Sequence, residues 1–182
     1  MKDLIINVSD CIKLRGWKPE WADELFRLTD KNRKYLQQWL PWVPGVKTEE
    51  DSRKFILKSL KEQKKGIGLE LSIWFQDKLV GCLGLHHLDK KNKKAAIGYW
   101  LDINHQGKGT MTLSVKALMK YSFQNLNLNR LEILAATQNP KSFTIAERLG
   151  FTKEGTLRET EFVNGRWFDY IVYSLLKREW KE

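Results

Sequence analysis

The chain has few cysteines and no long apolar segment. Cys11 and Cys82 are its two cysteines, too few for a disulfide framework, and neither belongs to a C-x-x-C motif. No apolar run approaches the roughly 20 residues that a membrane-spanning helix needs. The first residues, 1–6, lack the apolar core of a signal peptide. We therefore expect a cytoplasmic protein whose two cysteines behave as small, buried apolar residues.

Motifs for metal ions and for two common nucleotide sites are also missing. No H-E-x-x-H spacing occurs, and the adjacent His86 and His87 would point to opposite faces of a strand, so no metal site is expected. A Walker A loop needs glycine where Asp102 stands, and a dinucleotide fingerprint needs glycine in place of Thr112. Repeats, low-complexity tracts and linkers are absent too. The 182 residues, 42% of them hydrophobic, suit one well-buried domain over 1–182.

Positive charge is plentiful. The net charge of +10 favours anionic partners through long-range attraction, without naming the anion. The densest lysine cluster, 90–94, lies between two strand-like segments, where a solvated hairpin tip is the simplest interpretation. No aromatic residues alternate with these lysines, which counts against binding of single-stranded nucleic acid. We therefore expect no nucleic-acid partner.

Hydrophobic periodicity predicts eleven elements in the order strand, two helices, three strands, helix, strand, helix, two strands. The strands are expected at 12–17, 69–75, 79–88, 95–102, 131–137, 151–160 and 166–176, and the helices at 19–39, 48–65, 111–126 and 140–149. The order predicts an α+β fold with a mixed, mostly antiparallel sheet. Thr48 begins a possible capping box, and Gly66 ends that helix. Asn164-Gly165 is a hairpin signal.

The most informative segment joins strand 95–102 to helix 111–126. It reads Gln106-Gly107-Lys108-Gly109-Thr110-Met111. A glycine-rich turn that opens a helix leaves several backbone N–H groups unpaired, and the helix dipole adds positive charge there. Glycine also lets the backbone approach a ligand closely. The segment therefore predicts a phosphate-binding loop, with an ordinary turn as the alternative.

Four blocks, in order along the chain, resemble segments of one enzyme superfamily. They are Asn32-Arg33-Lys34 with Trp39-Leu40-Pro41-Trp42, the loop from Gln106, Asn139-Pro140-Lys141-Ser142 with 146–151, and 154–169. The second resembles the Q/R-x-x-G-x-G/A loop of the GNAT acetyltransferases, which holds the acyl-CoA pyrophosphate; Met111 departs from its last position. The third is similar to the N-x-x-S and A-x-x-x-G-F segments of that superfamily. The first and fourth are similar to its RimJ/RimL branch, the N-terminal acetyltransferases of ribosomal proteins.

The resemblance implies a single-domain GNAT-like sheet with helices on both faces. Two central strands, 95–102 and 131–137, would splay apart and admit the pantetheine arm of acetyl-CoA, the co-substrate. Free strand edges in such a gap need a hydrogen-bonding partner, which a ligand amide can supply. No metal is implied. The cofactor-binding residues would be Leu101, Asp102, Ile103, Gln106, Gly107, Lys108, Gly109, Thr110, Met111, Asn139 and Ser142.

Acetyl transfer to an amine requires proton removal from the amine, stabilisation of an oxyanion and departure of a thiolate. The resemblance implies Glu161 as the base, acting directly or through water; a solvated hairpin charge is the alternative. Ser142 would be the acid, or else an ordinary hydroxyl at a helix start. Tyr121, Tyr170 and Tyr173 stay open as substitutes for it. Asn139 would position the cofactor arm, cap its helix, or do both.

Three aromatic residues, Tyr35, Trp39 and Trp42, would wall the acceptor pocket or pack their helix onto the sheet. The expected activity is N-acetylation by direct attack, with the N-terminal α-amine of a ribosomal protein as acceptor. An acidic ribosomal protein would suit the charge of +10. The alternatives are a small-molecule acetyltransferase for a polyamine, aminoglycoside or amino acid, and a non-catalytic basic RNA- or ribosome-binding module. The resemblance also implies a homo-oligomer, with a dimer favoured.

Overall fold

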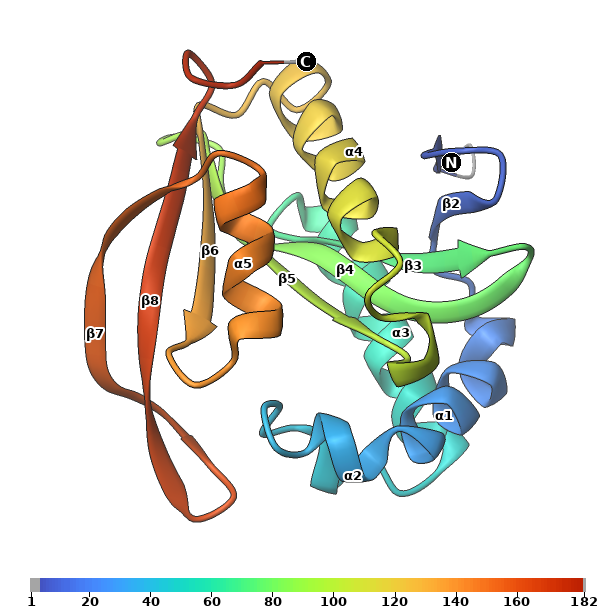
Figure 1. Ribbon diagram of the computed structural model, residues 1–182. Helices are drawn as coiled ribbons and strands as arrows, with labels where there is room; N and C mark the ends of the chain where they lie inside the picture. Colours follow the sequence, from blue (N-terminus) through green and yellow to red (C-terminus); the bar gives the residue numbers. More distant parts are fainter. Residues whose placement is uncertain (1–3, 182) are drawn as a thin grey trace.

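One mixed sheet organises residues 4–181, the part of the chain that the computed structural model describes. Its strand order is β1-β2-β3-β4-β5-β6-β8-β7 (Figure 1). The strands are β1 (Ile5–Asn7), β2 (Ile12–Gly16), β3 (Leu69–Phe75), β4 (Lys78–Asp89), β5 (Lys94–Leu101), β6 (Arg130–Ala136), β7 (Thr152–Val163) and β8 (Arg166–Leu176). Neighbours run antiparallel except β5 and β6, which are parallel. The predicted mixed, mostly antiparallel α+β sheet is confirmed.

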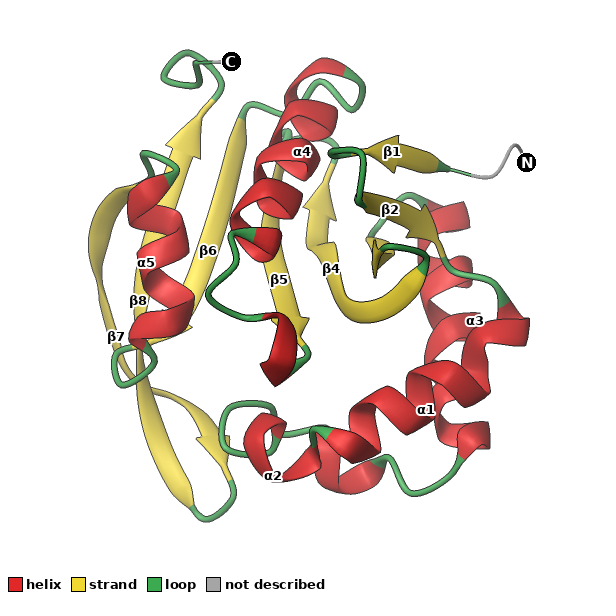
Figure 2. Cartoon of the chain, turned by 45° about the vertical axis from the view of Figure 1, so that its right-hand side comes forward, coloured by secondary structure: helices red, strands yellow, loops and turns green. Residues whose placement is uncertain are grey.

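Strands β5 and β6 separate soon after they start. They pair at Lys94 with Arg130, at Ala95 with Leu131 and at Ala96 with Glu132, and no register pair follows although both strands continue. Figure 2 shows the two strands diverging toward their C-terminal ends. Beyond Glu132, β6 is paired on its other side with β8. The predicted splay is confirmed, and it leaves backbone N–H and C=O groups facing the gap.

Helices cover both faces of the sheet, as expected. On one face, helices α4 (Thr110–Gln124) and α5 (Pro140–Arg148) pack on a core that contains Leu83, Ile97 and Val115. On the other, α1 (Ala22–Lys31) and α3 (Glu49–Lys65) pack around Trp74 and Cys82. We call these the α4/α5 face and the α1/α3 face. Alternate residues of β5 point to each, so one strand contributes to both cores.

Local sequence signals account for several boundaries. Thr48 accepts a hydrogen bond from the Asp51 N–H, and the Asp51 side chain accepts one from the Thr48 N–H, so the capping box exists. Gly66, with φ of 68°, ends α3 in the left-handed conformation. Asn164 and Gly165 both have positive φ, 49° and 86°, as the tight turn between β7 and β8 requires.

The predicted continuous helix over 19–39 is wrong. The segment forms a 3₁₀ turn (Pro19–Trp21), then α1, then the short α2 (Arg33–Leu36). Asn32 lies at the break, where its side-chain amide donates to the Leu28 carbonyl at 2.9 Å. Its amide oxygen accepts the N–H of Ile103 at 3.0 Å, from the loop after β5. A side chain that binds backbone groups in this way competes with helix continuation. Strand β1, three residues long, was also missed.

Candidate active site

A cavity of about 690 Å³ lies at the gap between β5 and β6. Its wall takes residues from β5 and β6, the loop after β5, the starts of α4 and α5, α2 and β8. The unpaired edge of β6 contributes Leu134, Ala135 and Ala136. An extended ligand with amide groups can pair with such an edge as an added strand would. The cavity therefore has a backbone edge along it and a glycine-rich loop at one end.

The glycine loop is shaped to receive an anion. Gly107 and Gly109 have φ of 72° and 75°, and a Cβ at either would meet no atom within 4 Å. Helix α4 starts at Thr110, and no side chain caps its N-terminal N–H groups. Thr110 lines the cavity and is 1% exposed, and its buried hydroxyl has no hydrogen-bond partner within the described part of the chain. A buried hydroxyl without a partner fits a site completed by a ligand oxygen.

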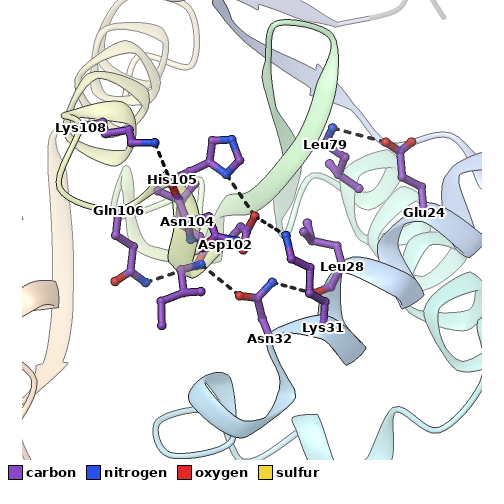
Figure 3. Close-up of polar contacts among 12 residues, drawn as sticks. Glu24, Leu28, Lys31, Asn32, Leu79, Asp102, Asn104, His105, Gln106 and Lys108 are labelled. Atoms are coloured by element: carbon purple, nitrogen blue, oxygen red, sulfur yellow. Dashed lines mark hydrogen bonds and ion pairs between the residues drawn. The ribbon is translucent and has the colours of Figure 1, made fainter.

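A polar network holds the start of this loop against α1 (Figure 3). The Asp102 carboxylate, 2% exposed, accepts a hydrogen bond from Lys31 Nζ at 3.1 Å and lies 3.1 Å from His105 Nδ1. Burial opposes ionisation of Asp102, but its hydrogen bonds, that from Lys31 above all, outweigh burial and lower its pKa. Lys108 Nζ donates to the Asn104 carbonyl at 2.9 Å. Asp102 and Lys108 thus bind groups of the loop and of α1, and neither lines the cavity.

The other predicted cofactor-binding residues do line it. They are Leu101, Ile103, Gln106, Gly107, Gly109, Thr110, Met111, Asn139 and Ser142. The Asn139 side chain makes no capping hydrogen bond to α5, so the capping alternative for that side chain is wrong. The cavity therefore collects two sequence blocks that are separated by about thirty residues along the chain.

Ser142 forms a pair with Tyr99 of β5. The Tyr99 hydroxyl donates to the Ser142 carbonyl at 2.9 Å, and the Ser142 hydroxyl donates to the Tyr99 oxygen at 3.4 Å. Both line the cavity. Burial raises the pKa of Tyr99 to about 12, so its phenol is neutral at pH 7 and is able to donate. Sequence reasoning missed Tyr99, because an aromatic residue inside a buried strand has no signal that separates it from core packing.

Glu161 forms a second pair, with Tyr170 of β8. The Tyr170 hydroxyl donates a hydrogen bond to the Glu161 carboxylate. Tyr170 lines the cavity, whereas the partly buried Glu161 does not. Burial and the bond to Glu161 both raise the pKa of Tyr170. Of the three tyrosines left open as acids, Tyr121 does not line the cavity, and Tyr173 is buried and donates to Glu147 at 2.9 Å.

The aromatic residues after α1 divide between two roles. Tyr35 and Trp39 line the cavity, and the Trp39 ring also packs on Phe168 with centroids 5.9 Å apart. Trp42 is 42% exposed and does not line the cavity; its ring lies 6.3 Å from that of Trp100, which does. Trp39 therefore has both predicted roles: it lines the cavity, and it packs its segment onto the sheet.

Two features are absent from residues 4–181. No group of three or more His, Cys, Asp or Glu side chains in this range is arranged to hold a metal ion. No helix in the range is both long and apolar enough to cross a membrane.

Comparisons with known proteins agree with this geometry. The model of the Acetyltransferase (GNAT) domain family matches residues 12–152. The chain is 37% identical, over 96% of both chains, to the protein named "Putative ribosomal N-acetyltransferase YdaF" of Bacillus subtilis (strain 168). It is 34% identical to the ribosomal-protein-serine acetyltransferase of Escherichia coli (strain K12), over 93% of this chain and 94% of that protein.

A solved structure of RimL, a ribosomal L7/L12 alpha-N-protein acetyltransferase in complex with coenzyme A, superimposes with a TM-score of 0.93. The identity is 32%, over 95% of this chain and 98% of that chain. The splayed strands, the glycine loop and the family match agree with one another. The chain belongs to the GNAT acetyltransferase family and is an acetyl-CoA-dependent acyltransferase.

Proposed function

We propose that this chain, acting as one domain over 1–182, transfers the acetyl group of acetyl-CoA to the N-terminal α-amine of a ribosomal protein by direct attack. The choice of acceptor rests on one observation: nearly the whole chain is similar to ribosomal-protein acetyltransferases. The cavity between β5 and β6 supports the reaction, because it joins an anion-binding loop to a wall of aromatic side chains.

The cofactor would lie along the cavity from the loop to the gap. The N–H groups at the start of α4 and the Thr110 hydroxyl would bind the pyrophosphate, and Gly107 and Gly109 would allow its close approach. The free edge of β6 would pair with the amides of the pantetheine arm. The Asn139 side chain, which makes no helix-capping bond, would help to position that arm.

Proton removal from the amine would use the Tyr170–Glu161 pair. Tyr170 contacts the cavity and Glu161 accepts its hydrogen bond. As the amine nitrogen bonds to the thioester carbon, that nitrogen becomes strongly acidic, so a carboxylate is a sufficient base at this step. The proton would reach Glu161 through the Tyr170 hydroxyl, which would give its own proton to Glu161 and take one from the nitrogen.

Departure of CoA would use the Ser142–Tyr99 pair. When the tetrahedral intermediate collapses, the C–S bond breaks and the sulfur leaves as a thiolate. The Ser142 hydroxyl would donate a hydrogen bond or a proton to it, and Tyr99 holds the start of α5 against β5 through the Ser142 carbonyl. Tyr99, a neutral phenol that lines the cavity, would be a second source of this proton if its hydroxyl turned from the Ser142 carbonyl to the sulfur.

The acceptor would enter beside α2, where Tyr35 and Trp39 line the cavity. A net charge of +10 would attract an acidic ribosomal protein. Such an enzyme would work in the cytoplasm. We also propose a homodimer; the exposed Phe162 and Trp167, whose rings contact each other at an angle of 56° with centroids 5.0 Å apart on the β7–β8 hairpin, are consistent with a partner surface there.

Acetyl-CoA-dependent release of CoA against a panel of amines tests the acceptor. The panel holds ribosomal-protein N-terminal peptides, a polyamine and an aminoglycoside. Turnover on one peptide alone is the expected result. Turnover on a small amine alone would keep the mechanism and discard the ribosomal acceptor. A protein that binds RNA with a steep salt dependence and has no turnover would be a binding module instead.

A further inference from the structure

An ionisable cluster on the α1/α3 face has no role in the chemistry above. Glu70 of β3 and His86 of β4 lie side by side, with Oε1 of the carboxylate 3.2 Å from Nδ1 of the imidazole. The Cys82 thiol donates to the other carboxylate oxygen at 3.3 Å. Glu70 is 9% exposed and the His86 side chain is 49% exposed. A buried carboxylate thus contacts one ring nitrogen of a histidine whose other nitrogen, Nε2, has no hydrogen-bond partner among the described residues.

Two glycines make room for this pair. Gly84 and Gly98 are cross-strand partners, and Glu70 is the partner of Gly84 on its other side. A Cβ on Gly84 would lie 2.5 Å from the Glu70 carboxylate, and a Cβ on Gly98 would lie 2.5 Å from His86 Nε2. Glu70 therefore lies over one glycine and the His86 ring over the other. Any other residue at either position would displace the pair.

Gly98 connects the pair to the cavity. Gly98 lines the cavity, as does Trp100, two residues further along the same face of β5. His86 does not line it, so the glycine separates Nε2 from the cavity with backbone alone. The His86 ring fills the space over Gly98, so a water molecule that bridges Nε2 to a group in the cavity would lie at the edge of the ring, beside Gly98.

The protonation states suit a proton acceptor. Burial lowers the pKa of His86, His87 lowers it further and Glu62 of α3 opposes both, so the ring is neutral at pH 7. Burial raises the pKa of Glu70 to about 7, against the Cys82 hydrogen bond and with help from Glu62. Burial also raises the pKa of Cys82, which stays a thiol and a donor.

The reaction needs two proton acceptors for the amine. An ammonium group and a thioester give an amide, a thiol and one free proton, so the nitrogen loses two protons while the sulfur gains one. The second loss, as the C–N bond forms, suits Glu161. The first, from the free ammonium, is difficult for a carboxylate of ordinary pKa, and it suits an imidazole better, because the ordinary pKa of an imidazole is closer to that of an α-amine.

We propose that the Glu70–His86 pair is the first proton acceptor of the acetyl transfer. His86 Nε2 takes, through a water molecule beside Gly98, the proton that the acceptor ammonium loses before attack, and the half-exposed ring then releases it to solvent. Glu70 is a positioning residue that fixes the ring through Nδ1 and stabilises the imidazolium. The proposal rests on the proposed acetyl transfer to an amine.

His86→Ala tests it, with His87→Ala as the matched control on the neighbouring exposed position. We expect kcat of His86→Ala at pH 7 to fall about 100-fold, with the Kd for acetyl-CoA unchanged and with recovery of rate on adding imidazole. His87→Ala should keep its kcat within twofold. A kcat within twofold of wild type in His86→Ala, or a loss that imidazole does not restore, would overturn the proposal.

Glu70→Gln gives a second, independent readout. The amide keeps the shape of the side chain and its contact with Nδ1 but removes the negative charge, so the imidazolium is less stable. The acidic limb of the kcat–pH profile, measured at saturating substrates, should move to lower pH; an unmoved limb contradicts the role of Glu70. Glu161→Gln separates the two proposals: if it is inactive while His86→Ala is normal, the proposed function stands and this inference fails.

Discussion

The hydroxyl of Tyr170 donates a hydrogen bond to the carboxylate of Glu161, and of the two side chains the tyrosine is the one that lines the cavity. Glu161, the base that sequence similarity implies, is therefore connected to the cavity through the Tyr170 hydroxyl.

Tyr170→Phe should lower kcat about 10- to 100-fold, because it removes the hydroxyl between the amine and Glu161. The Kd for acetyl-CoA should not change, since the phenyl ring still fills the cavity wall. Steady-state kinetics and calorimetry measure the two quantities. In the double variant with Glu161→Gln, the loss should be about that of one substitution alone, because the two groups act in series. Additive losses would mean that they act separately.

Gly109→Val should abolish binding of acetyl-CoA. The residue has φ of 75°, which a β-branched side chain adopts only with strain, and its added atoms would occupy the space before the start of α4. Isothermal titration with acetyl-CoA measures the effect. Gly165→Val, at φ of 86° in the β7–β8 turn, carries the same kind of strain away from the loop. It should lose stability but keep its affinity, and equal losses of affinity would argue against our placement of the cofactor.

Local signals predicted most of the architecture. Strand 69–75 matches β3, and the capping residue Thr48 and the terminating Gly66 set the limits of α3. The phosphate loop could be predicted from Gly107 and Gly109. Its function depends on a backbone conformation that glycine adopts readily, so the glycines themselves are the signal.

Contacts between distant segments could not be predicted in this way. The break at Asn32 depends on its bond to Ile103, 71 residues further along the chain. Glu70 and His86 meet through the register of β3 and β4, which periodicity alone does not supply. In the sequence the neighbour of His86 is His87, whereas its structural partner, Glu70, lies on another strand.

Asp102→Asn should weaken acetyl-CoA binding although Asp102 does not line the cavity. The charge pairs with Lys31 and helps to hold the loop against α1. We expect the KM for acetyl-CoA to rise about 10-fold, about 1.4 kcal/mol, with a smaller effect on kcat. Lys108→Ala should have a lesser effect, because among the described residues the Lys108 side chain binds only the Asn104 carbonyl. An unchanged KM in Asp102→Asn would mean that Asn32 alone holds the loop.

Glu70 should make the folded protein less stable as the pH rises from about 4.5 to about 7. Its pKa in the folded state is raised to about 7 from an ordinary 4.5, chiefly by burial. In that pH range the folded chain binds a proton that the unfolded chain has lost, so stability is full below the range and declines through it. At about 1.4 kcal/mol per pKa unit, the decline amounts to about 3 kcal/mol. Urea unfolding at several pH values measures it, and Glu70→Gln should remove this part of the slope, whereas Glu20→Gln at an exposed site should not. A wild-type slope that survives in Glu70→Gln would show that the carboxyl of Glu70 is ionised at low pH, and the imidazolium would then already have a full countercharge.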